Sequence, residues 1–156
     1  MNGALFVHTW RAYRGRLLVV TIGLLLWGVV LPVIFDSFGA QFQSMLDSGL
    51  IPPQFAQFGG GDIFSLTGSV ALGMAHPIAV GLNLVFAVGF CAAAVAGERQ
   101  RGTLEILLSR PLSRRTTYTT LGVAAVLFIG VTVAGFLAGA VIGSAATGRL
   151  DDLGLE

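Results

Sequence analysis

Long apolar runs separated by short charged segments dominate the pattern of this chain. No charged residue occurs at positions 17–35, 63–97 or 116–148. A helix needs about 20 mainly apolar residues to cross roughly 30 Å of hydrocarbon. Each run is therefore long enough for one membrane-spanning helix, and none obviously holds two together with a turn.

The pattern predicts an all-α membrane protein with three transmembrane helices. The spans are placed at residues 17–35, 77–97 and 121–144. Pro77 suits the first turn of the second span, where a backbone N–H is not needed. Pro32 is expected to kink the far end of the first span. The first span exceeds the roughly 7–15 residues of a signal-peptide core and lacks a small-residue cleavage site, so it is read as retained.

The segments before and after the first span are predicted to differ in structure. Residues 1–16 are predicted to form an interfacial helix, because their aromatic residues share one face and arginines lie beside it. That apolar face comprises Phe6, Trp10, Tyr13 and Leu17. The alternative is a short basic flank that only anchors the span. Residues 36–76 are predicted to form a long extracytoplasmic loop, with one or two short amphipathic helices between its Pro and Gly clusters.

The distribution of arginine predicts the orientation of the chain in the plasma (inner) membrane. Three arginines precede the first span, none lies in 36–76, five lie in 98–115 and one lies in the tail 145–156. Short loops rich in basic residues stay in the cytoplasm. We therefore expect a cytoplasmic N-terminus and 98–115 loop, and an extracytoplasmic 36–76 loop and C-terminus.

Composition argues against a soluble enzyme. Charged residues make up 11% of the chain, against roughly 25% in ordinary globular domains, and hydrophobic residues make up 54%. All nine basic residues are arginine, so the lysine of a nucleotide-binding P-loop is missing. His8 and His76 are predicted on opposite sides of the membrane, and Cys91 is alone within a span. We expect no catalytic residues, no metal site, no bound cofactor and no nucleic-acid partner.

Two features inside the spans concern helix packing. Gly135, Gly139 and Gly143 form a doubled G-x-x-x-G pattern that lets two helix backbones approach closely. Packing within one bundle is favoured over self-dimerisation. Asn83 is the strongly polar side chain of the second span, and it is expected to hydrogen-bond a neighbouring helix for about 1 kcal/mol. The alternative role for Asn83 is a contact along a translocation path.

The 98–115 loop carries the pattern most relevant to function. Thr103 after Gly102 can cap a short helix, which Pro111 ends by disfavouring helical geometry at Arg110. Leu104, Leu107 and Leu108 share one face of this helix. A helix of two turns or fewer is not stable alone, so its apolar stripe needs a surface. Either a partner protein or the lipid interface could supply that surface.

This loop also resembles a known family. Residues 97–115 read GERQRGTLEILLSRPLSRR, which is similar to the E-x-x-x-G-T-L-E-x-L-L-S-R-P-x-S-R stretch after the second span of ABC type-2 transporter permeases. The matching residues are Glu98, Gly102, Thr103, Leu104, Glu105, Leu107, Leu108, Ser109, Arg110, Pro111, Ser113 and Arg114. In sequence detail the resemblance covers this loop, and in layout it covers the whole chain.

The resemblance implies a cytoplasmic coupling helix that docks on a separate ATP-binding subunit. The three leucines would form its buried face, and Glu98 and Glu105 would pair with basic groups or order the loop. ATP and Mg²⁺ would be bound by the partner subunit, with export as the expected direction. Family permeases normally have six spans, so the chain is expected to act with a further three-span half or a second permease copy. A fragment, a truncated frame and a split permease all fit this layout.

The sequence is also compatible with two rival functions. A small membrane scaffold or assembly protein could recruit another cytoplasmic partner through the 98–115 loop. A channel-like homo-oligomer could be built on the glycine face of the third span, although a pore needs more polar lining than Asn83 provides.

Overall fold

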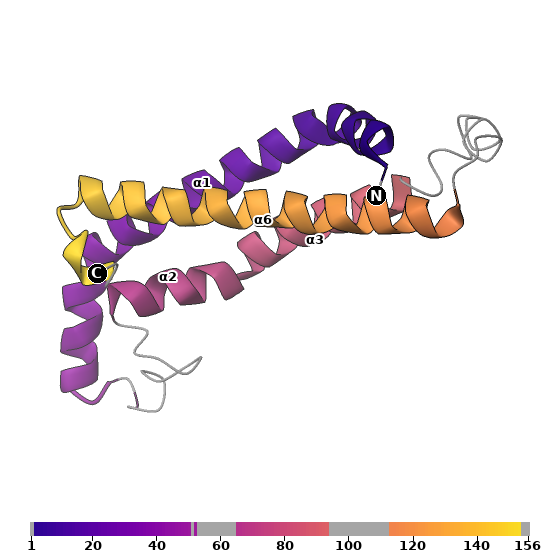
Figure 1. Cartoon of the computed structure of the whole chain (residues 1–156). Helices are drawn as coiled ribbons and strands as arrows, with labels where there is room; N and C mark the ends of the chain where they lie inside the picture. The colour runs from indigo at the N-terminus through magenta and orange to yellow at the C-terminus, as the bar shows by residue number, and fades with distance from the viewer. Residues whose placement is uncertain (1, 51, 53–64, 94–112, 154–156) are drawn as a thin grey trace.

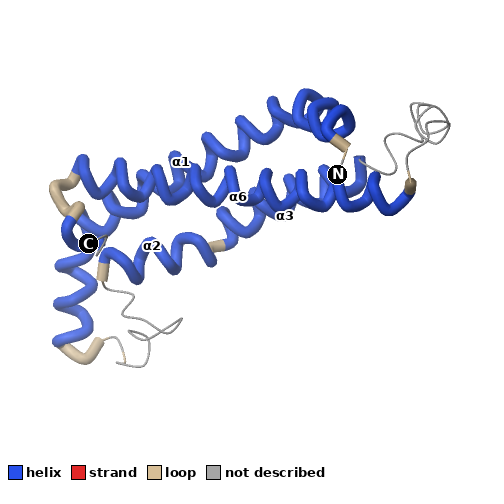
Figure 2. The backbone as a smooth tube through the Cα atoms, in the orientation of Figure 1, coloured by secondary structure: helices blue, strands red, loops and turns tan. Residues whose placement is uncertain are grey.

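The computed structural model describes residues 2–50, 52, 65–93 and 113–153, and the regular elements in these ranges are all helical. The elements are α1 Gly3–Asp47, α2 Leu66–Ala75, α3 Pro77–Ala92, α6 Arg114–Ala146 and the short 3-10 helix η3 Asp151–Leu153. Figure 1 shows α1 and α6 running in the same direction, while the α2–α3 pair runs the opposite way beside them. Figure 2 shows that short loops join α2 to α3 and α6 to η3.

Helix α1 is much longer than the predicted first span. Its 45 residues include the predicted interfacial segment 1–16 from Gly3 onward, and they continue through residues 36–47, which were predicted to lie in a loop. The predicted short helix of this region is continuous with the span: the segment has no proline, and only Gly39 interrupts its helix-compatible residues. The extracytoplasmic location of residues 36–47 stays a prediction. The helix ends at Ser48, and Gly49 follows with a left-handed φ of 76°.

Figure 1 also shows that α1 is not straight. Its first turns are seen almost end-on, and its last turns run down at the left of the view, away from α6. Pro32 lies buried inside the helix. The segment predicted to be interfacial is therefore continuous with the span, and its interfacial location stays a prediction.

The second apolar run forms two helices that meet at an angle. Helices α2 and α3 are bent by 40° at a short break, where His76 ends one helix and caps the other. Pro77 occupies the first turn of α3, as its sequence position suggests. Residues 66–75 belong to the predicted outer loop and form a helix of their own, and their extracytoplasmic location stays a prediction. The pair is either one broken span or a re-entrant loop.

Helix α6 contains the predicted third span and extends beyond it at both ends. Ser113 caps its start, with the Ser113 hydroxyl oxygen accepting a hydrogen bond from the Thr116 N–H at 3.1 Å. Helices α1 and α6 are each long and apolar enough to cross a membrane, and the bent pair raises the number of spans to three if it counts as one. The chain is a multi-pass membrane protein by these criteria.

Candidate functional site

The predicted coupling residues lie outside the residues that the structure describes. They are Glu98, Gly102, Thr103, Leu104, Glu105, Leu107, Leu108, Arg110 and Pro111. The helices on either side of this loop are described. The end of α3 and the start of α6 lie at the same end of the bundle as the N-terminus (Figure 1). We call this the N-terminal end of the bundle.

Contacts within the N-terminal end of the bundle join α1, α3 and α6 to one another. The backbone N–H of Asn2 donates to the Thr120 hydroxyl of α6 at 3.0 Å. Phe128 of α6 is fully buried and has ring contacts with α1 and α3. Its ring centroid lies 5.7 Å from Trp10 and 5.5 Å from Phe90. The two helices that flank the loop are therefore held to each other and to α1 by a packed aromatic cluster.

The glycine face of α6 lies directly against α1. A Cβ added at Gly135 would lie 2.5 Å from the Thr21 side chain. A Cβ at Gly139 would collide with the backbone of Leu25, and one at Gly143 would lie 2.5 Å from the carbonyl oxygen of Val29. Real Cβ atoms do not approach other atoms so closely, so these positions require glycine for the observed packing.

The close approach is reciprocal. Gly28 of α1 is buried, and a Cβ there would collide with the carbonyl oxygen of Phe136 and lie 2.9 Å from the backbone nitrogen of Ala140. Gly28 falls between Leu25 and Val29, the residues that face Gly139 and Gly143. The G-x-x-x-G spacing points to close packing but carries no information about this glycine on the partner helix.

Asn83 makes its contact to α6. The Thr132 hydroxyl lies 2.7 Å from Asn83 Oδ1, and the Asn83 amide donates to the carbonyl oxygen of Ala79 at 3.0 Å. Thr132 is fully buried, and its hydroxyl also lies 2.8 Å from the carbonyl oxygen of Ile129. The Asn83 carboxamide oxygen therefore links α3 to α6, while its NH2 group donates within α3.

An ion pair joins α1 to the C-terminal tail at the opposite end of the bundle. Arg149 Nε lies 2.7 Å from Asp36 Oδ1, and Arg149 Nη1 lies 3.4 Å from Asp152 Oδ2. The hydrogen bond to Asp36, followed by the nearby charge of Asp36 and contacts with Asp152, raises the pKa of the Arg149 guanidinium above its ordinary value. The guanidinium also lies 5.7 Å from the centroid of the Phe35 ring. The tail therefore packs on α1 rather than simply extending from α6.

Within the described ranges, no group of three or more histidine, cysteine or acidic residues has the geometry of a metal site. His8 lies on α1, whereas His76 lies at the break between α2 and α3 and packs against the Trp27 ring at 4.9 Å between centroids. Cys91 is exposed on α3.

Comparison with known proteins gives one finding. Residues 12–153 match the model of a family described as ABC-2 family transporter protein. This range covers α1 from Ala12, all the other described helices and the 98–115 loop. Searches of the curated proteins and of the solved structures found no match.

Proposed function

Because the chain belongs to the ABC-2 family of transporter proteins, we propose that it couples ATP hydrolysis by a separate cytoplasmic subunit to substrate export. Membrane subunits of this family are transport subunits rather than enzymes, and they usually work with a cytoplasmic ATP-binding subunit. The family match over residues 12–153 is the observation that carries the proposal. ATP and Mg²⁺ belong to the partner in this scheme, since the chain has no lysine for a P-loop of its own.

The 98–115 loop is the proposed contact with the ATP-binding subunit. Its leucine stripe supplies an apolar face for docking, and its two glutamates supply charge around that face. The packed helices on either side support a mechanical role. A force applied to the loop would act on α3 and α6 together, because the contact between Phe90 and Phe128 joins the two helices that flank it. A loop between loosely joined helices would transmit less of that motion.

The remaining functional partner in this proposal is a further three-span half or a second permease copy. The glycine face cannot serve that contact, because α1 already covers it. The same observation argues against a channel assembled on this face. Recruitment of an unrelated protein by a scaffold remains the competing function, and it requires no ATP-dependent step.

The deciding experiment replaces Leu107 and Leu108 by aspartate in a complete permease that carries this loop. Burial of one leucine side chain stabilises a contact by about 1.5–3 kcal/mol, and aspartate adds the cost of burying an unpaired charge. We expect the tagged ATP-binding subunit to be lost on co-purification, or its ATPase rate to lose its dependence on the permease. Membrane insertion should be unchanged, since residues 98–115 lie between spans.

The matched control is Leu150→Asp, which places an aspartate at an exposed leucine beside the Asp36–Arg149 ion pair. It should leave both readouts at the wild-type level. Glu105→Ala should have a milder effect than the double change, because an exposed ion pair contributes only about 0–1 kcal/mol. Wild-type association and permease-dependent ATPase activity in the double variant would refute the coupling role of the loop.

A further inference from the structure

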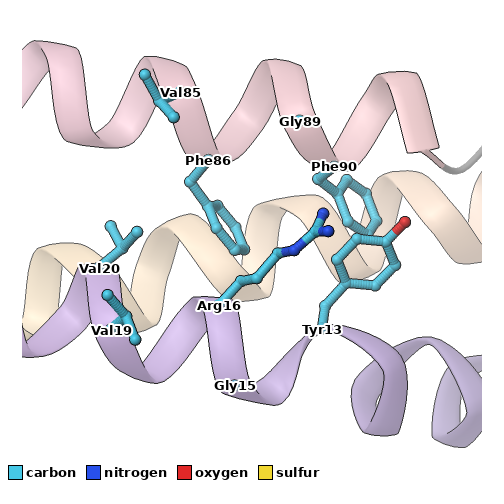
Figure 3. Close-up of a pocket in the computed structure, with 9 residues that line it drawn as sticks. All are labelled: Tyr13, Gly15, Arg16, Val19, Val20, Val85, Phe86, Gly89 and Phe90. Atoms are coloured by element: carbon cyan, nitrogen blue, oxygen red, sulfur yellow. The ribbon is translucent and has the colours of Figure 1, made fainter.

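A hollow of about 450 Å³ opens between α1 and α3 near the N-terminal end of the bundle. Figure 3 shows its lining, which is made almost entirely of apolar residues from both helices. Val19 and Val85 lie on opposite sides and are exposed, while Phe86 is buried. Arg16 is the charged residue of the lining.

Two glycines in the lining leave space in the hollow. A Cβ added at Gly15 or at Gly89 would meet no atom within 4 Å, apart from the neighbouring residues of its own helix. These glycines therefore differ from Gly139, where a Cβ would collide with α1. The hollow is a local widening between two helices, and its volume falls in the range of small-ligand pockets, roughly 300–1,000 Å³. A further helix, about 10 Å wide with its side chains, needs a groove along its length rather than such a pocket.

Arg16 is placed to recognise a phosphate at the membrane boundary. It is the last charged residue before the charge-free run 17–35, so it marks the point where α1 enters the hydrocarbon. Figure 3 shows its guanidinium group between the side chains of Phe86 and Tyr13, at the hollow. Among the residues that the structure describes, no carboxylate forms an ion pair with Arg16.

We propose that this hollow binds an anionic phospholipid, with part of one acyl chain between α1 and α3 and the phosphate on Arg16. The apolar lining suits a hydrocarbon chain, and a guanidinium forms paired hydrogen bonds with phosphate oxygens. Basic pockets between transmembrane helices on the cytoplasmic side are suited to anionic headgroups. The bound lipid would fill the space between α1 and α3 beside Phe86 and Phe90.

The test measures lipid retained by the full chain after extraction from bilayers of equal parts phosphatidylglycerol and phosphatidylcholine. Mass spectrometry of the purified protein gives the ratio of the two lipids. We expect phosphatidylglycerol to be enriched, and Arg16→Gln to lower its retention about tenfold, the size of effect expected from losing a charge-assisted hydrogen bond. Arg11→Gln removes the same charge from α1 outside the hollow and should retain the lipid.

A second pair of variants tests the acyl-chain part of the proposal. Gly89→Leu fills the hollow without meeting other atoms at its Cβ, whereas Gly81→Leu adds the same side chain to α3 outside the hollow and also has a free Cβ position. Gly89→Leu should lower retention and Gly81→Leu should not. Equal loss in Arg11→Gln and Arg16→Gln, full retention in Gly89→Leu, or no preference for phosphatidylglycerol would each overturn the proposal. Displacement of the lipid by inorganic phosphate alone would show a phosphate site rather than a lipid site, and would overturn it as well.

Discussion

The indole N–H of Trp27 donates a hydrogen bond of 2.9 Å to the backbone carbonyl oxygen of Gly73. Gly73 lies four residues before Pro77, which has no N–H to donate to it as a continuous helix would require. The His76 N–H also approaches this carbonyl, at the longer distance of 3.4 Å. An unsatisfied backbone group in hydrocarbon costs several kcal/mol. A side chain of α1 therefore stabilises the break between α2 and α3.

Trp27→Phe should destabilise the protein by about 1–3 kcal/mol, because it keeps an aromatic ring but removes the donor to a part-buried carbonyl. Unfolding by a graded addition of denaturing detergent, followed by circular dichroism, measures the change. Trp10→Phe is the control: Trp10 packs its ring on Phe128, and no described residue accepts a hydrogen bond from its indole. Equal shifts in the two variants would show that ring packing, rather than the hydrogen bond, explains the effect of Trp27.

Gly139→Ala should also be destabilising, by about 1–3 kcal/mol, because the new methyl group collides with the backbone of Leu25, which cannot rotate away. Gly130→Ala makes the same change on the same helix at a position with nothing within 4 Å. We expect Gly130→Ala to be neutral or slightly stabilising. The same detergent titration compares the two variants, and similar midpoints would contradict the observed packing of α6 on α1.

The sequence predicted the apolar helices and the small-residue face, because both leave a local signal in residue type and spacing. It could not identify α1 as the helix facing Gly139, since the same spacing serves any partner helix. It could not show that the helix of residues 36–47 would be continuous with the first span. Pro77 marked the start of a span, but nothing in the local sequence showed that Trp27 of α1 would hydrogen-bond the helix that precedes Pro77.

For the polar groups, the sequence singled out Asn83 but could not identify the residues that pair with one another. Asn83 stands out in an apolar run, but its partner Thr132 is one of many threonines in the chain. The ion pair between Asp36 and Arg149 joins residues 113 positions apart, and no local pattern relates them. Long-range pairings of this kind depend on how the helices pack.

Two threonines make a matched test of these buried hydroxyls. Thr132→Val should destabilise by roughly 1–2 kcal/mol, because it removes the hydrogen bond to Asn83 within the bundle. Thr21→Val should be neutral or stabilising, because the buried Thr21 hydroxyl has no hydrogen-bond partner among the described residues and its methyl group, which faces Gly135, is retained in valine. Detergent-unfolding midpoints distinguish the two, and a larger loss from Thr21→Val would contradict the hydrogen bonds described here.

The orientation of the bundle can be tested with single cysteines at positions 48, 100 and 150 in a chain from which Cys91 has been removed. Ser48 and Leu150 are exposed, and Asp36 with Arg149 places the C-terminal tail on α1 at the end opposite the N-terminus. The arginine distribution predicts that this end faces outward and that Gln100 faces the cytoplasm. A membrane-impermeant thiol reagent added to intact cells should therefore label positions 48 and 150 but not position 100. Position 100 should react only after the membrane is opened, which shows that its cysteine is present and reactive.

Labelling at 100 with protection at 48 and 150 would invert the topology and remove the 98–115 loop from reach of a cytoplasmic ATP-binding subunit. Labelling at 48 with protection at 150 would instead separate the two ends of the Asp36–Arg149 contact and contradict the packing of the tail.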